Sequence, residues 1–273
     1  MRSKINFVSM FVMATTLFAI MMAPTAAIAT HSWSTYHWAR TSNPFYLKVV
    51  DSNTTGWDSA LALAKTDWSK STVLNMISGA SDDSSSTRKR CPMVSGQVRS
   101  CNASYGFNGW LGLASINISG SHITQGSSKM NDSYFNGGGY TETNRRHVMC
   151  QELGHTLGLG HTSEDGSDQQ TCMDYSNDLG NPSPNQHDYD LLASKYSHLD
   201  STTTVSFSAF AANQFGDDPD APHNWGRLVS QSANGRSSYY ERDNMNGTKK
   251  ATHVFWTQEA ADRCHGCDHR YDH

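Results

Sequence analysis

The spacing of apolar residues predicts a sheet with packed helices between residues 45 and 200. Residues 57–68 place a stripe of Trp57, Leu61, Ala64 and Trp68 on one helical face, so this helix should pack on the sheet. The stretch 78–89 is rich in Ser and Asp and is expected to be a polar loop. Strands are predicted at 45–50, 71–77, 97–104, 110–118 and 122–130.

Two further helices are predicted after these strands. The first begins near Thr141 or Thr143, either of which can cap its N-terminus, and runs to about residue 157. The second covers residues 186–196, with Asn185 as its cap and apolar side chains at helical spacing. The sequence does not fix the relative directions of the strands.

The character of the chain changes after residue 200. Residues 201–204 read Ser-Thr-Thr-Thr, a linker-like run, and few apolar clusters follow beyond residues 225–229 and 254–256. We therefore expect one domain over residues 30–200. Residues 201–273 are expected to form a C-terminal appendage that is small and β-rich or partly disordered.

The N-terminal 29 residues have the features of a secretory signal peptide. Arg2 and Lys4 precede an apolar run over residues 7–22, and Ala27-Ile28-Ala29 provides small residues for cleavage. The mature chain should begin near Thr30 and be secreted to the extracellular space. An uncleaved membrane anchor is the alternative, but the apolar run is on the short side for a stable span.

Charge and cysteine content narrow the class further. The formal net charge of the chain is -4, so no strong basic field is available for nucleic acid. Six cysteines in an exported chain suggest three disulfides, and spacing favours Cys91 with Cys101. Cys264 and Cys267 suit a local disulfide or a disordered tail; with His265, His269 and His273 around them, a second zinc site is the alternative.

The candidate chemistry lies in residues 150–161. On a helix, Gln151 and His155 stand one turn apart and project from one face, the geometry of two ligands on one metal ion. Gly158 lets the chain leave the helix at a φ that a side chain would penalise, so His161 can return to the same point. Glu152 sits beside the ligand pair, where its carboxylate can take a proton from a metal-activated water.

These residues resemble the zinc signature of the metzincin metallopeptidases, the group that includes matrixins and astacins. That signature is H-E-x-x-H-x-x-G-x-x-H, followed by a Met-turn. The chain matches it at Glu152, His155, Gly158 and His161, and departs from it at Gln151, which stands where the family has its first histidine. The resemblance implies that Gln151, His155 and His161 hold zinc.

The substitution at residue 151 changes the strength of one ligand more than its charge. A glutamine carbonyl oxygen is neutral, as a ligating imidazole is, but it is a weaker donor to zinc, so weaker metal binding is expected. His147 lies on the same helical face but about 12 Å from His155 along the axis, too far to share the ion. It is interpreted as a surface or core histidine.

The downstream segment 171–175 fits the Met-turn of the resemblance. Met173 is followed by Tyr175, and in the astacin and serralysin branches this tyrosine approaches zinc or donates to the tetrahedral intermediate; here Thr171 replaces their serine. A buried aromatic under the site is the alternative reading of Tyr175. The resemblance also implies that the helix and the Met-turn lie together, which would place Cys150 beside Cys172 for a disulfide.

The resemblance implies an α+β fold with a mixed twisted sheet, two long helices, a Met-turn and a C-terminal helix. It implies a zinc endopeptidase that acts on extended peptides or proteins, with Glu152 as general base and Tyr175 as a second catalytic residue. We expect the protein to be a monomer. We assign the substrate-binding edge strand to residues 110–118, where Gly112 and Ala114 would leave room for a peptide.

Two other functions remain open. One is an inactive metzincin-derived protein that binds extracellular peptide or polymer in the same cleft, although a dead site has no need for Glu152. The other is a cell-surface interaction protein whose function resides in residues 201–273. A calcium site among Glu164, Asp165 and Asp168 is a further candidate, without the regular spacing of an EF-hand.

Overall fold

A computed structural model describes residues 31–163, 166–176, 178–205, 221–264 and 266–271. The predicted signal peptide, residues 1–29, lies outside this range. Among the described residues, none of the helices combines the length and the apolar character that a membrane span requires.

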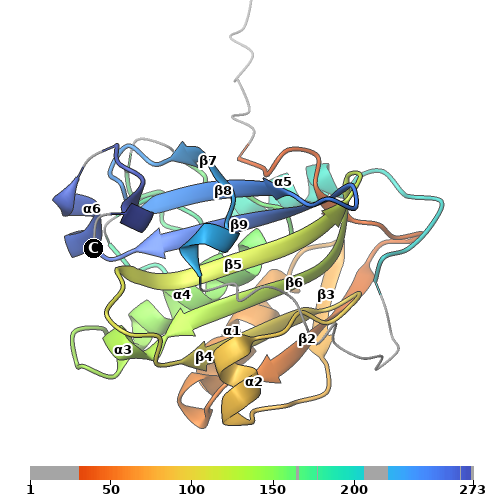
Figure 1. The fold of residues 1–273 in the computed structure, drawn as a ribbon. Helices are drawn as coiled ribbons and strands as arrows, with labels where there is room; N and C mark the ends of the chain where they lie inside the picture. The colour runs from red at the N-terminus through yellow and green to blue at the C-terminus, as the bar shows by residue number, and fades with distance from the viewer. Residues whose placement is uncertain (1–30, 164–165, 177, 206–220, 265, 272–273) are drawn as a thin grey trace, which may run out of the picture.

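Nine strands of the described residues form one mixed sheet, which crosses the whole molecule (Figure 1). Their order is β3-β2-β4-β6-β5-β9-β8-β7, and β1 pairs with β6. The strands are β1 His37–Trp38, β2 Phe45–Ser52, β3 Leu74–Ser78, β4 Val98–Ala103, β5 Trp110–Ser119, β6 His122–Asn131, β7 Arg227–Gln231, β8 Ser237–Asp243 and β9 Thr248–Trp256.

The sheet has a parallel half and an antiparallel half. The pairs β2 with β3, β2 with β4, β4 with β6 and β1 with β6 are parallel. From β5 onward, every pair through β9, β8 and β7 is antiparallel. The fold is therefore α+β with a mixed sheet.

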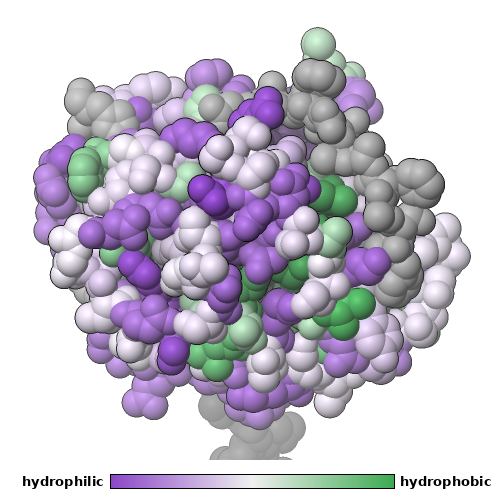
Figure 2. Space-filling model, turned by 90° about the horizontal axis from the view of Figure 1, so that it is seen from below, coloured by the Kyte–Doolittle hydropathy of each residue, from purple (hydrophilic) through white to green (hydrophobic). Residues whose placement is uncertain are grey.

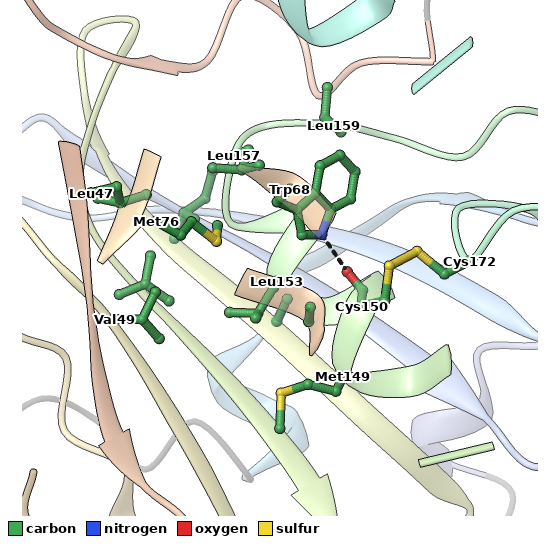
Figure 3. Packing of buried hydrophobic residues seen from close by; sticks show 14 of the residues in the cluster. Leu47, Val49, Trp68, Met76, Met149, Cys150, Leu153, Leu157, Leu159 and Cys172 are labelled. Atoms are coloured by element: carbon green, nitrogen blue, oxygen red, sulfur yellow. Dashed lines mark hydrogen bonds between the residues drawn. A yellow bond between two sulfur atoms is a disulfide. The ribbon is translucent and has the colours of Figure 1, made fainter. Parts of the chain in front are cut away.

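Helices α1 and α4 lie together on one face of the sheet, behind it in the view of Figure 1. The predicted stripe of α1 is buried there, and the indole Nε1 of Trp68 donates to the carbonyl of Cys150 in α4 at 3.0 Å (Figure 3). The helices are α1 Asp58–Trp68, α2 Ser85–Arg90, α3 Asp132–Phe135, α4 Glu142–His155, α5 Gln186–Lys195 and α6 Gln258–Arg263.

The expectation of a loop over residues 78–89 is wrong in part, because α2 begins at Ser85. Ser84 caps this short helix by accepting a hydrogen bond from the backbone N–H of Thr87 at 3.3 Å. None of its residues is buried, so no apolar stripe marked it as a helix.

The expected edge strand at residues 110–118 is also corrected, because β9 pairs along β5 on the side away from β6. The appendage expected after residue 200 is β-rich, but its strands continue the sheet of the preceding part. Ala251 and Phe255 of β9 belong to the same hydrophobic cluster as Leu153 of α4. The residues before and after 200 thus share a core.

Three disulfides join the six cysteines. Cys91 bonds to Cys101, and Cys150 of α4 bonds to Cys172 in the segment that carries Met173 (Figure 3). The third joins Cys264 to Cys267, so the local disulfide holds there and those sulfurs are not free for zinc.

A second, smaller core covers the opposite face of the antiparallel half. Leu113 of β5 and Val254 of β9 face this side, because neighbouring residues of a strand point to opposite faces. On the face of the molecule seen from below, polar residues dominate and apolar ones form small separate areas (Figure 2). The second core consists of Trp110, Leu113, Trp225, Tyr240, Val254, Trp256 and Ala260.

Candidate metal centre

The last turn of α4 carries three of the predicted site residues, Gln151, Glu152 and His155, all fully buried. The helix begins at Glu142, and Thr141 is its N-cap: the Thr141 hydroxyl accepts from the N–H of Asn144, while the Asn144 side chain accepts from the N–H of Thr141. This reciprocal cap fixes the start of the helix.

Gly158 ends this helical segment as the sequence predicts. Its φ is +81°, and a Cβ there would lie 2.2 Å from the carbonyl oxygen of Tyr36. The turn brings His161 back to His155, and their ring centroids are 4.5 Å apart. Two predicted ligands from different segments therefore meet.

Hydrogen bonding sets the tautomer of His155. Its Nδ1 lies 2.9 Å from the carbonyl oxygen of Leu159, which can only accept, so Nδ1 holds the proton. Nε2 of His155 and Nε2 of His161 are both buried without a hydrogen-bond partner. Burial lowers the pKa of His155 to about 3, so its ring is neutral and its Nε2 lone pair is available to a metal ion.

A third histidine, His253, completes the group. On β9 it lies two residues from both Ala251 and Phe255, so all three side chains point to the face of the sheet on which α4 packs. Its ring centroid lies 3.9 Å from that of His155, and one ligand atom from each of His155, His161 and His253 lies within 4.8 Å of the other two. Unlike the other two histidines, His253 has both ring nitrogens engaged: Nδ1 lies 3.1 Å from Glu152 Oε2, and Nε2 lies 2.7 Å from the hydroxyl of Ser237.

Sequence reasoning missed His253, because residues 201–273 were assigned to an appendage. No spacing relates it to the motif at 150–161, since its position depends on the pairing of β9 with β5. The one available signal was its place in the apolar run Thr252-His253-Val254-Phe255-Trp256. A histidine inside a strand-like run needs a polar partner when it is buried.

Glu152 occupies a space that Gly112 of β5 leaves open. A Cβ on Gly112 would lie 2.5 Å from Glu152 Oε1, so this glycine accommodates the carboxylate, not a peptide as expected. Oε2 lies 3.1 Å from Nδ1 of His253, while Oε1 is buried without a hydrogen-bond partner. Burial raises the pKa of Glu152 to about 8, against the opposing effect of His155.

Gln151 uses one end of its amide and leaves the other unpaired. Its Nε2 donates to the carbonyl oxygens of Cys172 at 3.0 Å and Asp174 at 3.3 Å. Its Oε1 is buried without a hydrogen-bond partner. Because α4 places residue 151 one turn before His155, this oxygen is a candidate donor for the same ion.

Met173 and Tyr175 lie under and beside the histidines. A Cβ on Gly154 of α4 would lie 2.5 Å from the Met173 sulfur, so the helix and this segment are in direct contact. The ring of Tyr175, which is partly exposed, lies 4.0 Å from that of His161. The two readings of Tyr175, catalytic donor and packing aromatic, both fit this contact.

The site is covered from the N-terminal side. Trp33 stacks on His155 with ring centroids 5.0 Å apart and planes 5° from parallel. A pocket of about 290 Å³ reaches the group from outside. It is lined by the histidines 31, 161 and 253, by Tyr175 and Tyr239, and by Val229 and Ser230 of β7, among others.

Two other predicted candidates lie elsewhere. His147 is fully buried, its Nδ1 is 2.8 Å from the carbonyl oxygen of Asn181, and burial lowers its pKa to about 4. Of the calcium candidates, Glu164 and Asp165 lie outside the described residues. Asp168 accepts from the side chain of Asn181 at 2.8 Å.

No family model matches the chain, and no curated protein matches it. A solved structure with which it can be superposed is high choriolytic enzyme 1, a hatching-enzyme zinc protease from the medaka fish Oryzias latipes. The identity is 14%, the TM-score is 0.34, and the match covers 60% of this chain and 96% of that one. A likeness this loose carries no functional argument, which must come from the site itself.

Proposed function

We propose that the chain is a zinc-dependent peptidase. The observation that carries this proposal is the meeting of His155, His161 and His253 beside Glu152, with ligand atoms within 4.8 Å of one another. The donor set fits zinc, because imidazole nitrogens are its usual ligands and the Nε2 atoms of His155 and His161 are buried and unpaired. His253 would bind through Nε2 once the hydroxyl of Ser237, 2.7 Å away, has turned aside. The Oε1 atom of Gln151 is proposed as an additional donor.

Bound zinc would supply a Lewis acid that polarises the scissile carbonyl and acidifies water. The protein's own part is proton transfer. Glu152, in its ionised form, would accept a proton from the attacking water and later return it to the leaving amine. A bound cation favours this form and opposes the burial that raises the pKa of Glu152 to about 8. His253 lies 3.1 Å from Oε2 of Glu152 and orients the carboxylate.

Tyr175 is proposed to donate its hydroxyl to the oxyanion that develops on the substrate. Its position at the mouth of the pocket, against His161, supports this role. A donor directed at the developing charge stabilises the transition state more than the ground state.

The substrate we propose is an extended segment of a peptide or protein. It cannot add to β5, because β9 occupies that side. The pocket instead opens beside β7, which pairs with β8 alone among the described strands. A peptide that enters the pocket can form backbone hydrogen bonds with this strand edge.

We further propose that the enzyme acts outside the cell as a monomer. The three disulfides persist in oxidising surroundings, and the features of residues 1–29 fit export.

The test is Glu152→Gln in the mature chain, with casein as substrate. Cleavage by the wild type should be abolished by a chelator and restored by zinc. The variant should lose about 10²- to 10⁴-fold in rate, because the amide cannot accept the proton, while its zinc content stays unchanged. Undiminished cleavage by the variant would remove Glu152 from the mechanism.

A metal-binding but inactive protein is the second candidate, favoured by the full burial of Glu152 and His155 beneath Trp33. Trp33→Ala separates the two candidates. Faster cleavage in this variant would identify Trp33 as a cover over an active site. A wild type and a variant that both bind zinc and both leave casein intact would establish the binding protein.

A further inference from the structure

A second histidine cluster lies apart from the candidate metal centre. It joins three separate parts of the chain: β1, the first residue of β6, and the segment that follows α5. His37 and His122 are partners in the parallel pairing of β1 with β6. The second histidine cluster consists of His37, His122, His198 and Asp200.

Side-chain atoms of His37, His122 and Asp200 lie within 4.8 Å of one another, and His198 approaches His37 and Asp200. Oδ1 of Asp200 lies 3.3 Å from Nε2 of His37, 3.3 Å from Nε2 of His122 and 3.8 Å from Nε2 of His198. Nε2 of His198 lies 3.1 Å from Nε2 of His37. In a tetrahedral zinc site with bonds of about 2.0–2.1 Å, ligand atoms stand about 3.4 Å apart, which is close to these separations.

The backbone turns the ring of His37 towards Asp200. Nδ1 of His37 lies 2.7 Å from the carbonyl oxygen of Thr35, which can only accept, so Nδ1 carries a proton. Nε2 therefore faces Oδ1 of Asp200 at 3.3 Å, where either a proton on Nε2 or a metal ion can join the two atoms.

The remaining oxygen of Asp200 is already engaged. Oδ2 accepts from the backbone N–H of Arg40 at 3.1 Å and from its guanidinium at 2.9 Å. The same guanidinium donates to the carbonyl oxygen of His198. Arg40, which is buried, thus fixes the segment that carries both residues and turns Oδ1 of Asp200 towards the histidines. Such outer contacts orient the ligands of metal sites.

We propose that the second histidine cluster binds a structural zinc ion. His37, His122 and Asp200 would supply three ligands, and Nε2 of His198, which lies near two of them, would move in as the fourth and close a tetrahedral shell. The ion ties β1, near the start of the mature chain, to the residues that follow α5. It is independent of the proposed peptidase centre.

The test is zinc stoichiometry of the mature chain by elemental analysis, with Zn²⁺ as the only added metal. Three double variants are compared with the wild type: His122→Ala/His198→Ala in the second histidine cluster, His155→Ala/His161→Ala in the candidate metal centre, and His187→Ala/His223→Ala as a matched control. His122 and His198 are partly exposed, their side chains at 34% and 49%, so their removal should leave the fold intact, which circular dichroism verifies.

We expect about two zinc ions in the wild type and control, and about one in each of the other two variants. Casein cleavage should survive in the His122/His198 variant. Equal zinc in that variant and the control would overturn the second site. If only the peptidase centre fails, the wild type holds one ion, which the His155/His161 variant retains and the His122/His198 variant loses.

A structural role adds a second readout. In the His155→Ala/His161→Ala background, a chelator should lower Tm, and Co²⁺ in place of zinc should give the strong visible absorption of a four-coordinate ion. When His122 and His198 are also replaced, the chelator should leave Tm unchanged. A chelator-insensitive Tm in the first background would show that a proton holds the cluster together, and would refute the metal site.

Discussion

Around the candidate metal centre, the protein binds one polar atom of a side chain and leaves the other turned inward. Nδ1 of His155 donates to the carbonyl oxygen of Leu159, and Nε2 of Gln151 donates to that of Cys172. Oε2 of Glu152 pairs with Nδ1 of His253. Each of these contacts fixes the rotamer of the group, so the inward atoms need no reorganisation when an ion or water binds.

The relative importance of the ligands can be measured by replacing them singly. His253→Ala should weaken zinc binding by about 100-fold or more, because the loss of a ligand exceeds the cost of losing an outer contact. Gln151→His should tighten binding, because imidazole nitrogen is a better donor to zinc than an amide oxygen. Competition titration with a chromophoric chelator gives both affinities.

For each substitution, one outcome would contradict the proposed role of the residue. Unchanged affinity in Gln151→His would show that residue 151 does not contact the ion. Unchanged affinity in His253→Ala would leave the remaining histidine pair and Gln151 as the ligand set implied by the family resemblance.

His147 gives a pH dependence away from the metal ligands. Its pKa is about 4 in the folded chain and 6.5 in the unfolded one, so between these values the unfolded state binds more protons. Its contribution is present above pH 6.5 and is lost as the pH falls to 4. The loss is worth about 3 kcal/mol of the free energy of unfolding.

His147→Gln keeps a donor for the carbonyl of Asn181 but cannot titrate. Urea unfolding at pH 6.5 and 4.5, with chelator present throughout, should show a smaller decrease for the variant than for the wild type. Equal decreases would mean that His147 is protonated without penalty in the folded state.

At the scale of elements, the hydrophobic pattern predicts the helices and strands that bury one face. The cap at Asn185 and the start of α5 at Gln186 agree with the prediction, as do β5 and β6 to within a residue. What it could not supply is pairing between distant strands. The contact of β9 with β5 depends on residues more than a hundred positions apart, so His253 could not be assigned to the site from spacing.

The close packing of β5 against α4 predicts that a side chain at Gly112 would displace Glu152. Gly112→Ala would place a methyl group 2.5 Å from Oε1 of Glu152 and 2.7 Å from Val148. We expect a loss of peptidase activity as the carboxylate is displaced, with zinc retained, and a stability cost of about 1–3 kcal/mol.

Gly126→Ala on β6 is the matched control, because its Cβ would meet Thr156 at an ordinary 3.4 Å. Steady-state kinetics and zinc analysis on both variants decide the point. If Gly112→Ala is as active as Gly126→Ala, the space at Gly112 is not required by Glu152.

At the scale of the whole molecule, β7, β8 and β9 belong to the same sheet as the earlier strands, and Ala251 and Phe255 belong to the same core as α4. Deletion of residues 206–273 would expose one side of β5 and remove the partners of Trp110 and Leu113 in the second core. It would also remove His253. We expect the truncated chain to be insoluble or to lose cooperative unfolding, metal binding and activity together.

Circular dichroism, zinc analysis and casein cleavage of the truncated chain test this expectation. A folded, active protein of residues 30–205 would instead establish the division at residue 200 that sequence composition suggested.

The position of His253 has a consequence for how the proposed metal centre is assembled. The first two histidines of the proposed centre are synthesised almost one hundred residues before the third. A nascent chain that has just released α4 from the ribosome carries the motif but not the strand that completes it. Proteolytic activity of the proposed kind would thus be withheld from the growing polypeptide until β9 has been synthesised and has paired with β5.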